Sequence, residues 1–443
     1  MQLIIYLSAF ERSERLLQCT TIMLVPVWFT KELFQNALRI FHQNSDIHVL
    51  DVSTKDAIPA GENYTSDLFR STIKYRCSKS GRIEVISVIV KCANEEGGVK
   101  ENLEKELNLF EKEAEMFGRT FPAMYDVLGG MRNVFCSLKT NCWVSGSFYT
   151  LSSKCLLTSL VPHKIIILED LTALGFNVLP RHIGFDLEHC FLVVEKLAQM
   201  HAASVIMYEN DPSLVKLYSE GLYGNNPLTR DWVAAGYKGL IDACSRWPGF
   251  EKYGYKLQAL GEQALDRGFR AQKRKLGGFN VLNHGDLWVN NMMFAYHPNG
   301  NLKDMRFIDF QMNIFTSPAI DLHYFIATST KIQVKLDHIE IILDHYYAQL
   351  IANLAKMQYS LERVPSREQF KKDYNYRAFY GLMGAATVLA FVKAAEGRTD
   401  ASFENIIKDE SPEGFRYHAY NNERYRKHME HLLPYYDSFG ILD

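Results

Sequence analysis

One stretch limits what this chain can fold into more than any other. Residues 281–291 read Val-Leu-Asn-His-Gly-Asp-Leu-Trp-Val-Asn-Asn, and apolar side chains flank the polar ones, with Phe279 before them and Met292 and Met293 after. Polar groups in such a place are costly to bury unless they are paired. Phe307-Ile-Asp-Phe-Gln311 likewise sets a carboxylate in an apolar run. The fold must therefore give both segments hydrogen-bond partners or a bound ligand.

Asp286, Asn291 and Asp309 are the oxygen donors of these two segments. Strand-like runs over 291–297 and 302–310 are joined by a segment with an Asn-Gly step, which favours a tight turn. We therefore expect a hairpin that brings Asp309 back beside Asn291. A carboxylate and an amide oxygen suit a hard cation such as Mg²⁺, which completes its shell with water and phosphate. Asp286 then faces a substrate hydroxyl, as phosphoryl transfer requires.

A polar loop over 61–66, Gly-Glu-Asn-Tyr-Thr-Ser, lies between two strand-like runs. Gly61 lets backbone N–H groups approach a phosphate, and Asn63 and Ser66 add short polar side chains. Glycines and hydroxyls also occur in ordinary turns, so this segment alone is weak evidence for a phosphate site.

Lys91 and Glu113 form a candidate ion pair. Lys91 ends the β-rich run 82–91, and an ammonium group on a buried strand requires an anionic partner. Glu113 lies three residues after Phe110 on the apolar side of the helical pattern 99–117, from where it can reach back to Lys91. A lysine that extends to solvent and a solvated helix glutamate are the plainer alternatives.

Length and composition indicate a large globular protein. A chain of 443 residues, 47% of them apolar, favours two or three structural units with a sizeable core. The net charge of −2 argues against a bulk nucleic-acid binder. No window long enough to cross a bilayer is apolar and uncharged throughout, so we expect no membrane span.

The cysteines and a sequon both predict a cytoplasmic protein. The eight cysteines are scattered and form no Cys-x-x-Cys pair, so we interpret them as reduced, mostly buried thiols. The Asn63-Tyr-Thr65 sequon falls in the polar loop, where a glycan is incompatible with a bound nucleotide. The opening MQLIIYLSAF lacks a basic lead and is a poor secretory signal.

The pattern along the chain predicts an α+β fold. Residues 1–25 are an N-terminal extension of uncertain status, residues 26–170 are strand-rich, and residues 171–443 are mostly helical. A hairpin is predicted over 70–91. The predicted helices cover 30–42, 99–117, 186–208, 232–243 and 251–273, and a short buried strand covers 165–168.

Six motifs in one order carry a family resemblance. They are Gly61-Glu-Asn-Tyr64, Phe110-x-x-Glu113, Leu168-Glu-Asp-Leu171, Leu197-Ala-x-x-His201-Ala-Ala-Ser204, His284-Gly-Asp-Leu-Trp-Val-Asn-Asn291 and Ile308-Asp-Phe-Gln311. The last two resemble the catalytic and metal-binding loops of protein kinases, and their glycine and glutamine point to small-molecule kinases. Together the six resemble the ecdysteroid kinase-like family, related to choline kinases and aminoglycoside phosphotransferases, over roughly residues 26–443.

The resemblance implies a bilobal, protein-kinase-like fold with a small strand-rich N-lobe and a larger helical C-lobe, and it implies ATP and Mg²⁺ as cofactors. Gly61, Asn63 and Ser66 would cover the phosphates of ATP. Lys91 would contact the nucleotide and pair with Glu113, and Glu169 and Leu171 would lie at the hinge beside adenine. Asp286 would be the catalytic residue, and Asn291 and Asp309 would be the metal ligands. His284 and Asp321 would brace the catalytic loop, and His201 is kept as structural.

Several readings of the function stay open at this stage. The favoured one is phosphorylation of a hydroxyl on a small, apolar steroid or xenobiotic. A choline- or ethanolamine-type kinase is the first alternative, and a nucleotide-binding pseudokinase scaffold is the second. Thr65 and Asp67 depart from the family pattern and leave the loop geometry in doubt. The aromatic residues between 218 and 255 can line an acceptor pocket, although core packing is the commoner role.

Asp286 is expected to orient the acceptor hydroxyl and to accept its proton late. An aspartate with an ordinary pKa near ~3.9 is a feeble base for an alcohol. A loose transition state demands little early deprotonation, and charge neutralisation by Mg²⁺ and Lys91 is the larger contribution.

Overall fold

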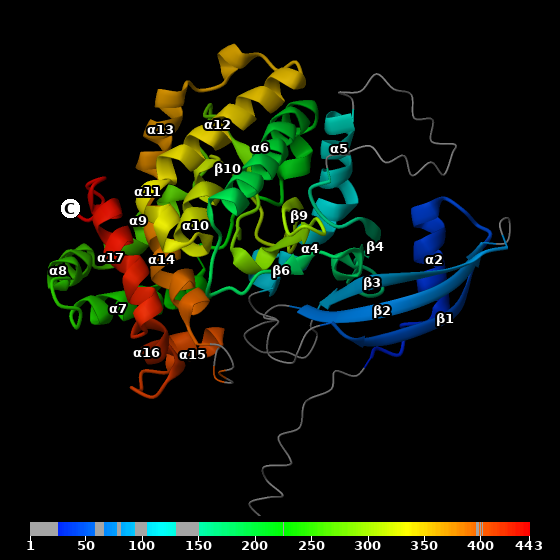
Figure 1. Cartoon of the computed structure of the whole chain (residues 1–443), viewed down its shortest axis with the longest axis horizontal. Coiled ribbons are helices and arrows are strands. Elements are labelled where there is room, and N and C mark those ends of the chain that lie inside the picture. Colours follow the sequence, from blue (N-terminus) through cyan, green and yellow to red (C-terminus); the bar gives the residue numbers. More distant parts are fainter. Residues whose placement is uncertain are drawn as a thin grey trace, which may run out of the picture. The chain divides into compact units, whose positions relative to one another are not determined.

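A computed structural model describes residues 25–57, 66–77, 81–93, 104–129, 150–224, 226–395, 398, 400 and 402–443. The chain forms two compact units (Figure 1). Unit 1 is Met1–Glu95 with Cys155–Asp170, and unit 2 is Glu96–Lys154 with Leu171–Asp443. Unit 1 is strand-rich and unit 2 is larger and mainly helical, so the predicted α+β class is confirmed. The boundary predicted at residue 170 stays a prediction, and this division assigns the described residues 104–129 and 150–154 to unit 2.

Unit 1 is an antiparallel sheet with a helix against it (Figure 1). Its elements are α2 (Lys31–His42), β1 (Ile47–Asp56), β2 (Ser66–Cys77), β3 (Ile83–Ala93), β4 (Cys155–Ser159) and β5 (Ile165–Glu169). The strand order is β1-β2-β3-β5-β4, with antiparallel neighbours. α2 begins where predicted because the Thr30 hydroxyl accepts a hydrogen bond from the backbone N–H of Leu33.

The core of unit 1 lies between α2 and the sheet. Phe34 of α2 is fully buried in one apolar cluster with Ile73 and Val88 of the strands. The hairpin predicted over 70–91 is formed by β2 and β3, and residues 78–80 between them lie outside the described part. Alternating burial along β2 follows the two-residue period of a strand with one face on the core.

Unit 2 is built from helices and two small sheets. Its helices are α4 (Leu109–Glu115), α5 (Phe121–Gly129), α6 (Leu187–Asn210), α7 (Pro227–Cys244), α8 (Glu251–Leu260), α9 (Glu262–Ala271), α10 (Ala319–Ser329), α11 (Ile332–Asp337), α12 (Ile339–Lys356), α13 (Arg367–Tyr376), α14 (Ala378–Lys393), α15 (Phe403–Lys408), α16 (Phe415–Tyr420) and α17 (Glu423–Asp437). Single turns are η1 (Met116–Thr120), η2 (Leu171–Leu174), η3 (Pro212–Val215), η4 (Val289–Asn291) and η5 (Leu361–Arg363). The strands are β6 (Asn177–Val178), β7 (Val281–Asn283), β8 (Met292–Tyr296), β9 (Leu302–Phe307) and β10 (Ile314–Thr316), paired as β6-β8-β9 and β10-β7.

Helix α6 is the longest described helix of unit 2 and packs along α12 (Figure 1). Among the described residues it is the one helix that is long and apolar enough, by composition, to cross a membrane. Two-thirds (67%) of its most apolar window is buried inside the molecule, including Val193, Leu197 and Val205. This burial is typical of the core helix of a globular protein.

Two predicted helices are interrupted. The pattern over 99–117 breaks at Asn108, where the backbone takes a left-handed φ of 50° before α4 begins. The pattern over 251–273 splits into α8 and α9 at Gly261, which also has a φ of 50°. Asn and Gly adopt this conformation at lower cost than other residues. Apolar periodicity continues across both positions, so it did not reveal the breaks.

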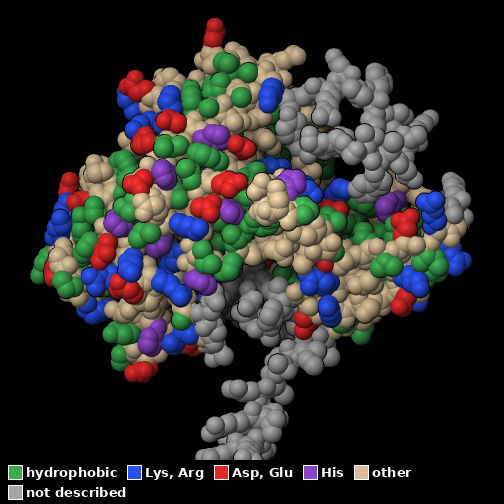
Figure 2. Space-filling view, viewed as in Figure 1, with side chains coloured by type: hydrophobic (Ala, Val, Ile, Leu, Met, Phe, Trp, Pro, Cys, Tyr) green, Lys and Arg blue, Asp and Glu red, His purple; other side chains and the backbone are tan. Residues whose placement is uncertain are grey.

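The surface of unit 2 carries charges of both signs. Figure 2 shows Lys and Arg side chains interspersed with Asp and Glu over its visible face. This mixture agrees with the formal net charge of −2 for the whole chain, which argues against a bulk nucleic-acid binder.

Burial of His323 on α10 predicts that the protein loses stability in acid. Nε2 of its fully buried ring donates to the carbonyl oxygen of Tyr374 at 2.7 Å, and burial lowers the pKa of His323 to about 4. The unfolded chain therefore takes up this proton at higher pH than the folded one. The resulting stability is complete above pH ~6.5 and is lost as the pH falls towards 4, up to about 3 kcal/mol for this residue.

Urea unfolding at pH 7, 6, 5 and 4.5 measures this loss. We expect the His323→Gln variant to be less stable at pH 7 and to have a shallower pH dependence than the wild type. The matched control is His297→Gln, because His297 is exposed and its loss leaves the pH dependence unchanged. Equal slopes in wild type and His323→Gln would contradict the assignment.

Candidate functional site

The segment that follows β7 turns sharply at Gly285. Its φ of +81° lies in the left-handed region, and a Cβ at this position would stand 1.9 Å from the carbonyl oxygen of Met312. Only glycine fits both the backbone angle and the space. The glycine after His284, which distinguished this chain from protein kinases in the sequence analysis, thus has a steric cause.

Asp321 of α10 holds this turn in place. One of its carboxylate oxygens accepts the backbone N–H of His284 at 2.7 Å, and the other accepts that of Gly285 at 2.9 Å. His201 of α6 donates to Asp321 through Nε2 at 3.2 Å, and its Nδ1 accepts from the Tyr346 hydroxyl at 2.7 Å. Burial lowers the pKa of His201, so its ring is neutral and serves as a brace, as the sequence analysis assumed.

The loop is tied to the segment that carries Asp309. Nε2 of His284 donates to the carbonyl oxygen of Ile308 at 2.9 Å, and the backbone N–H of Ile308 donates to the carbonyl oxygen of Asn291 at 3.0 Å. β8 and β9 pair with Met292 opposite Phe307. The predicted hairpin therefore forms and places Asp309 beside Asn291.

Both carboxylate oxygens of Asp286 are hydrogen-bonded. Oδ1 accepts from the Tyr324 hydroxyl at 2.6 Å, and Oδ2 accepts from Nδ2 of Asn291 at 3.0 Å. Burial raises the pKa of Asp286 to about 7, with Asp309 adding to the rise and the Tyr324 hydrogen bond opposing it. The ordinary pKa assumed from the sequence was wrong, because sequence alone does not reveal this burial. Asp286 is consequently a much better proton acceptor than an exposed aspartate.

Asp309 has an unusual backbone conformation. Its φ of 65° is left-handed, which is uncommon outside glycine and less costly for Asp than for most residues. Its Oδ2 accepts from Nε2 of Gln311 at 3.1 Å. Gln311, which stands where protein kinases have a glycine, therefore helps to hold the carboxylate of Asp309.

The oxygens of Asn291 and Asp309 fit a hard cation. Asn291 uses its amide nitrogen on Asp286, which leaves the amide oxygen as the donor for a metal. Asp286 and Asp309 repel each other electrostatically, and a bound cation relieves that repulsion. No group of three or more His, Cys, Asp or Glu in the described ranges can hold a metal by itself. In a metal site here, the protein would contribute one amide oxygen and one carboxylate. This suits Mg²⁺, whose other ligands would be phosphate and water.

Glu113 of α4 belongs to unit 2 and Lys91 of β3 to unit 1. Glu113 is 1% exposed, and its Oε1 accepts the backbone N–H of Phe310 at 3.2 Å. It thereby supports the residue next to Asp309. Lys91 is 6% exposed on its strand. Their pairing stays a prediction.

The predicted nucleotide contacts of unit 1 are described in part. Gly61 and Asn63 lie outside the described residues, and Ser66 is the first residue of β2. Glu169 ends β5, and Leu171 begins η2 in unit 2. Their contact with adenine stays a prediction.

Asp170, between the two hinge residues, has a structural role that the sequence analysis missed. It is 3% exposed, and its Oδ2 accepts from Nε of Arg70 at 2.8 Å and from the Ser87 hydroxyl at 2.7 Å. These bonds fix the end of β5 against β2 and β3. No local signal in the sequence links residues so far apart.

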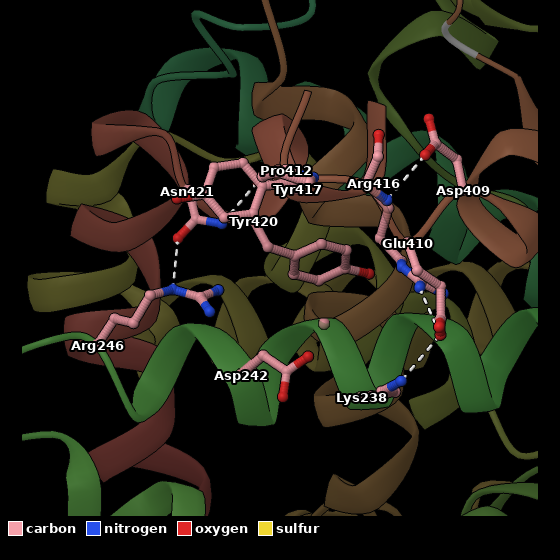
Figure 3. Close-up of a pocket in the computed structure, with 12 residues that line it drawn as sticks. Lys238, Asp242, Arg246, Asp409, Glu410, Pro412, Arg416, Tyr417, Tyr420 and Asn421 are labelled. Carbon is pink, nitrogen blue, oxygen red and sulfur yellow. Dashed lines mark hydrogen bonds and ion pairs between the residues drawn. The ribbon is translucent and has the colours of Figure 1, made fainter. Parts of the chain in front are cut away.

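A pocket of about 240 Å³ lies elsewhere in unit 2, between α7 and the segment that leads into α16 (Figure 3). It contains none of the predicted site residues. Glu410 within it is paired with Lys238 and Arg416, each at 2.9 Å, and Arg246 donates to Asn421 at 2.9 Å. Because these charges already satisfy one another, the chemistry is better placed at Asp286.

The aromatic residues between 218 and 255 are mainly core. Tyr218, Tyr223 and Trp232 are buried, whereas Tyr255 is 73% exposed. The hydroxyl of Tyr223 is paired with that of Thr387 at 2.9 Å. Most of these aromatic residues therefore pack in the core.

Comparison with known families decides the identity of the chain. Residues 60–359, about two thirds of its length, match the model of the Ecdysteroid kinase-like family. The chain belongs to this family. As an ecdysteroid kinase-like protein it has the predicted kinase-like α+β fold and is of the small-molecule kinase type. The matched range contains all six motifs quoted above and the residues Asp286, Asn291 and Asp309.

Other comparisons are more distant. No curated protein matches this ecdysteroid kinase-like chain significantly. Among solved structures 15 chains match. One is an ethanolamine kinase of Plasmodium vivax, 12% identical with a TM-score of 0.40, where the match covers 94% of this chain and 96% of that chain. A likeness at this level carries no information on substrate or mechanism.

Tyr324 is the site residue that the sequence analysis missed in this ecdysteroid kinase-like protein. It follows Asp321 by three residues on α10, and residues three apart lie on one face of a helix. That spacing was the available signal. This spacing indicates a site residue only once Asp321 is known to contact the turn that carries Asp286.

Proposed function

We propose that this protein transfers the γ-phosphoryl group of ATP to a hydroxyl of a small, largely apolar molecule, an ecdysteroid or a xenobiotic, with Mg²⁺ as cofactor. The observation that carries the proposal is the convergence of Asp286, Asn291 and Asp309. Asn291 contacts Asp286 at 3.0 Å, and Asp309 is close enough to raise its pKa. Family membership adds the kinase type.

In the proposed reaction the acceptor oxygen forms a bond to the γ-phosphorus while the bond to the β,γ-bridging oxygen breaks and ADP leaves. Asp286 orients the acceptor hydroxyl and takes its proton. Mg²⁺, when bound by Asn291 and Asp309, supplies charge neutralisation on the phosphates. Lys91 contacts the α- and β-phosphates with Glu113 as its partner, Gly61, Asn63 and Ser66 cover them, and the backbone near Glu169 and Leu171 meets the adenine.

We place this reaction in the cytoplasm. The described cysteines are free thiols, and Cys92, Cys190 and Cys244 among them are buried. Cys19, Cys136 and Cys142 lie outside the described residues. Free thiols are usual where glutathione keeps cysteines reduced, and ATP is available there.

The test is ATP consumption by the purified protein with a panel of steroids, plant phenolic glucosides and choline. We expect turnover with a steroid or phenolic glucoside and a phosphorylated acceptor of the expected mass. Turnover of choline alone would contradict the acceptor class. Thermal stabilisation by Mg·ATP without turnover of any acceptor would favour a scaffold.

Replacing Asp309 by asparagine should weaken metal-dependent nucleotide binding. Asparagine tolerates the left-handed φ of this position, so the backbone is kept while the charge is lost. We expect apparent Mg²⁺ affinity in the presence of ATP to fall at least about tenfold. The measurement is the rise in melting temperature with ATP at increasing Mg²⁺.

Asp304→Asn is the matched control for this prediction. Asp304 lies on β9, the strand before Asp309, and pairs with Lys196 at 3.0 Å. Its loss removes an acidic group without touching the proposed ligands. Equal Mg²⁺ dependence in wild type and Asp309→Asn would show that the cation is held elsewhere.

A further inference from the structure

The phenol of Tyr324 contacts the carboxylate of Asp286 directly. Its hydroxyl donates to Oδ1 at 2.6 Å, within the short range of a hydrogen bond to a charged carboxylate. Tyr324 is 1% exposed, so solvent does not compete for this bond. It is a tight contact to the residue proposed to meet the acceptor.

The position of the phenol is fixed by its surroundings. Tyr324 lies on α10, which packs closely on α14. Gly384 of α14 faces the ring, since a Cβ there would lie 3.5 Å from Cδ2 of Tyr324. The ring of Tyr380 is 6.4 Å away between centroids. Full burial between these neighbours leaves the side chain little freedom to turn away.

The other oxygen of Asp286 is held from a different element. Nδ2 of Asn291 donates to Oδ2 at 3.0 Å and to the carbonyl oxygen of Asp286 at 2.9 Å. A carboxylate has about four lone-pair sites, and these two donors occupy one on each oxygen. The carboxylate therefore cannot rotate without losing a hydrogen bond, and its remaining lone pairs keep fixed directions. Asp286 is only half-buried, so an acceptor can approach it.

We propose that Tyr324 is a positioning residue for phosphoryl transfer, which fixes the carboxylate of Asp286 in the orientation that receives the acceptor hydroxyl. The inference rests on the proposed function. Tyr324 itself is hidden from solvent and lies on none of the segments assigned to the nucleotide. Its loss should therefore lower kcat and leave KM for ATP unchanged, because a misplaced reacting group costs rate more than binding.

The first experiment measures kcat and KM of Tyr324→Phe, which removes only the hydroxyl, with the acceptor found active in the panel. We expect kcat to fall roughly tenfold and KM for ATP to stay within about twofold. Tyr425→Phe is the matched control, because Tyr425 is fully buried and its hydroxyl donates to the carbonyl oxygen of Ala385 at 3.1 Å. The control should lose stability and keep kcat.

A double-mutant cycle separates positioning from a general loss of structure. If Tyr324 acts through Asp286, Tyr324→Phe adds no further loss of kcat in an Asp286→Asn background. If it only stabilises the fold, the same factor is lost in both backgrounds. An additive cycle, an unchanged kcat in Tyr324→Phe, or a raised KM for ATP alone overturns this inference while an active wild type leaves the proposed function standing. A wild type without turnover of any acceptor overturns both.

Discussion

Replacing Asp286 by asparagine is expected to lower kcat about 1,000-fold and to leave a folded protein that still binds Mg·ATP. The asparagine cannot take the acceptor proton. The acceptor hydroxyl also loses the charged oxygen that orients it. Binding of the nucleotide depends on other groups in the proposed scheme, chiefly Asn291, Asp309 and Lys91.

The fold should tolerate this change well. Asparagine has the same shape, its oxygen can accept from Nδ2 of Asn291, and its nitrogen can donate to the Tyr324 hydroxyl, so both present partners remain bonded. The substitution also removes a charge that is unfavourable here, since burial and Asp309 raise the pKa of Asp286. We therefore expect a melting temperature equal to or above that of the wild type.

Two measurements check this prediction: turnover with the active acceptor, and melting temperature with and without Mg·ATP. The matched control is Asp266→Asn, because Asp266 forms an exposed ion pair with Arg230 at 3.3 Å and such pairs contribute little. If the variant unfolded, its loss of activity would say nothing about catalysis. A melting temperature equal to or above that of the wild type would show that the loss of kcat is not a loss of the folded state, and a fully active Asp286→Asn would end the catalytic assignment.

The local part of this site could be predicted from the sequence. Asn291 and Asp309 meet because two short strand-like runs are joined by a tight turn, and both features are visible in residue types. Glu113 stands on an apolar helix face, and its burial followed from spacing. These inferences depend on neighbours within about one element.

The rest depends on packing between distant elements. Asp321 reaches the N–H groups of His284 and Gly285 because α10 lies against the turn, and no pattern in the sequence fixes that placement. The raised pKa of Asp286 requires its burial to be known. The break at Asn108 likewise goes against an unbroken apolar stripe, since tertiary contacts override local preference.

The second large effect concerns Asp321. It is fully buried and accepts hydrogen bonds from His284, Gly285 and His201 at 2.7, 2.9 and 3.2 Å. In Asp321→Asn the amide nitrogen replaces one acceptor and faces an N–H donor, so at least one buried backbone group loses its partner. A buried donor that is left without its acceptor costs about 1–3 kcal/mol. We expect a loss of that size in urea unfolding.

The same substitution should reduce activity even in folded protein. Without the carboxylate the turn at Gly285 is held by fewer bonds, and Asp286 is the next residue along the chain. A shift of about 1 Å in the reacting group can cost about 100-fold in rate, so kcat measured well below the unfolding transition should fall by that order. KM for ATP should change less, because Asp321 contacts the backbone of the turn and is not among the proposed nucleotide contacts.

Asp266→Asn is again the appropriate control, since its carboxylate belongs to an exposed ion pair with Arg230 at 3.3 Å. It should cost little stability and no kcat. His201→Gln provides an intermediate case, because it removes one of the three donors to Asp321 and leaves both backbone bonds. A graded loss of stability and kcat from His201→Gln to Asp321→Asn is expected if Asp321 is the brace. Full stability and full kcat in Asp321→Asn would mean that the carbonyl oxygen of Ile308, through its bond to His284 at 2.9 Å, is sufficient to hold the loop.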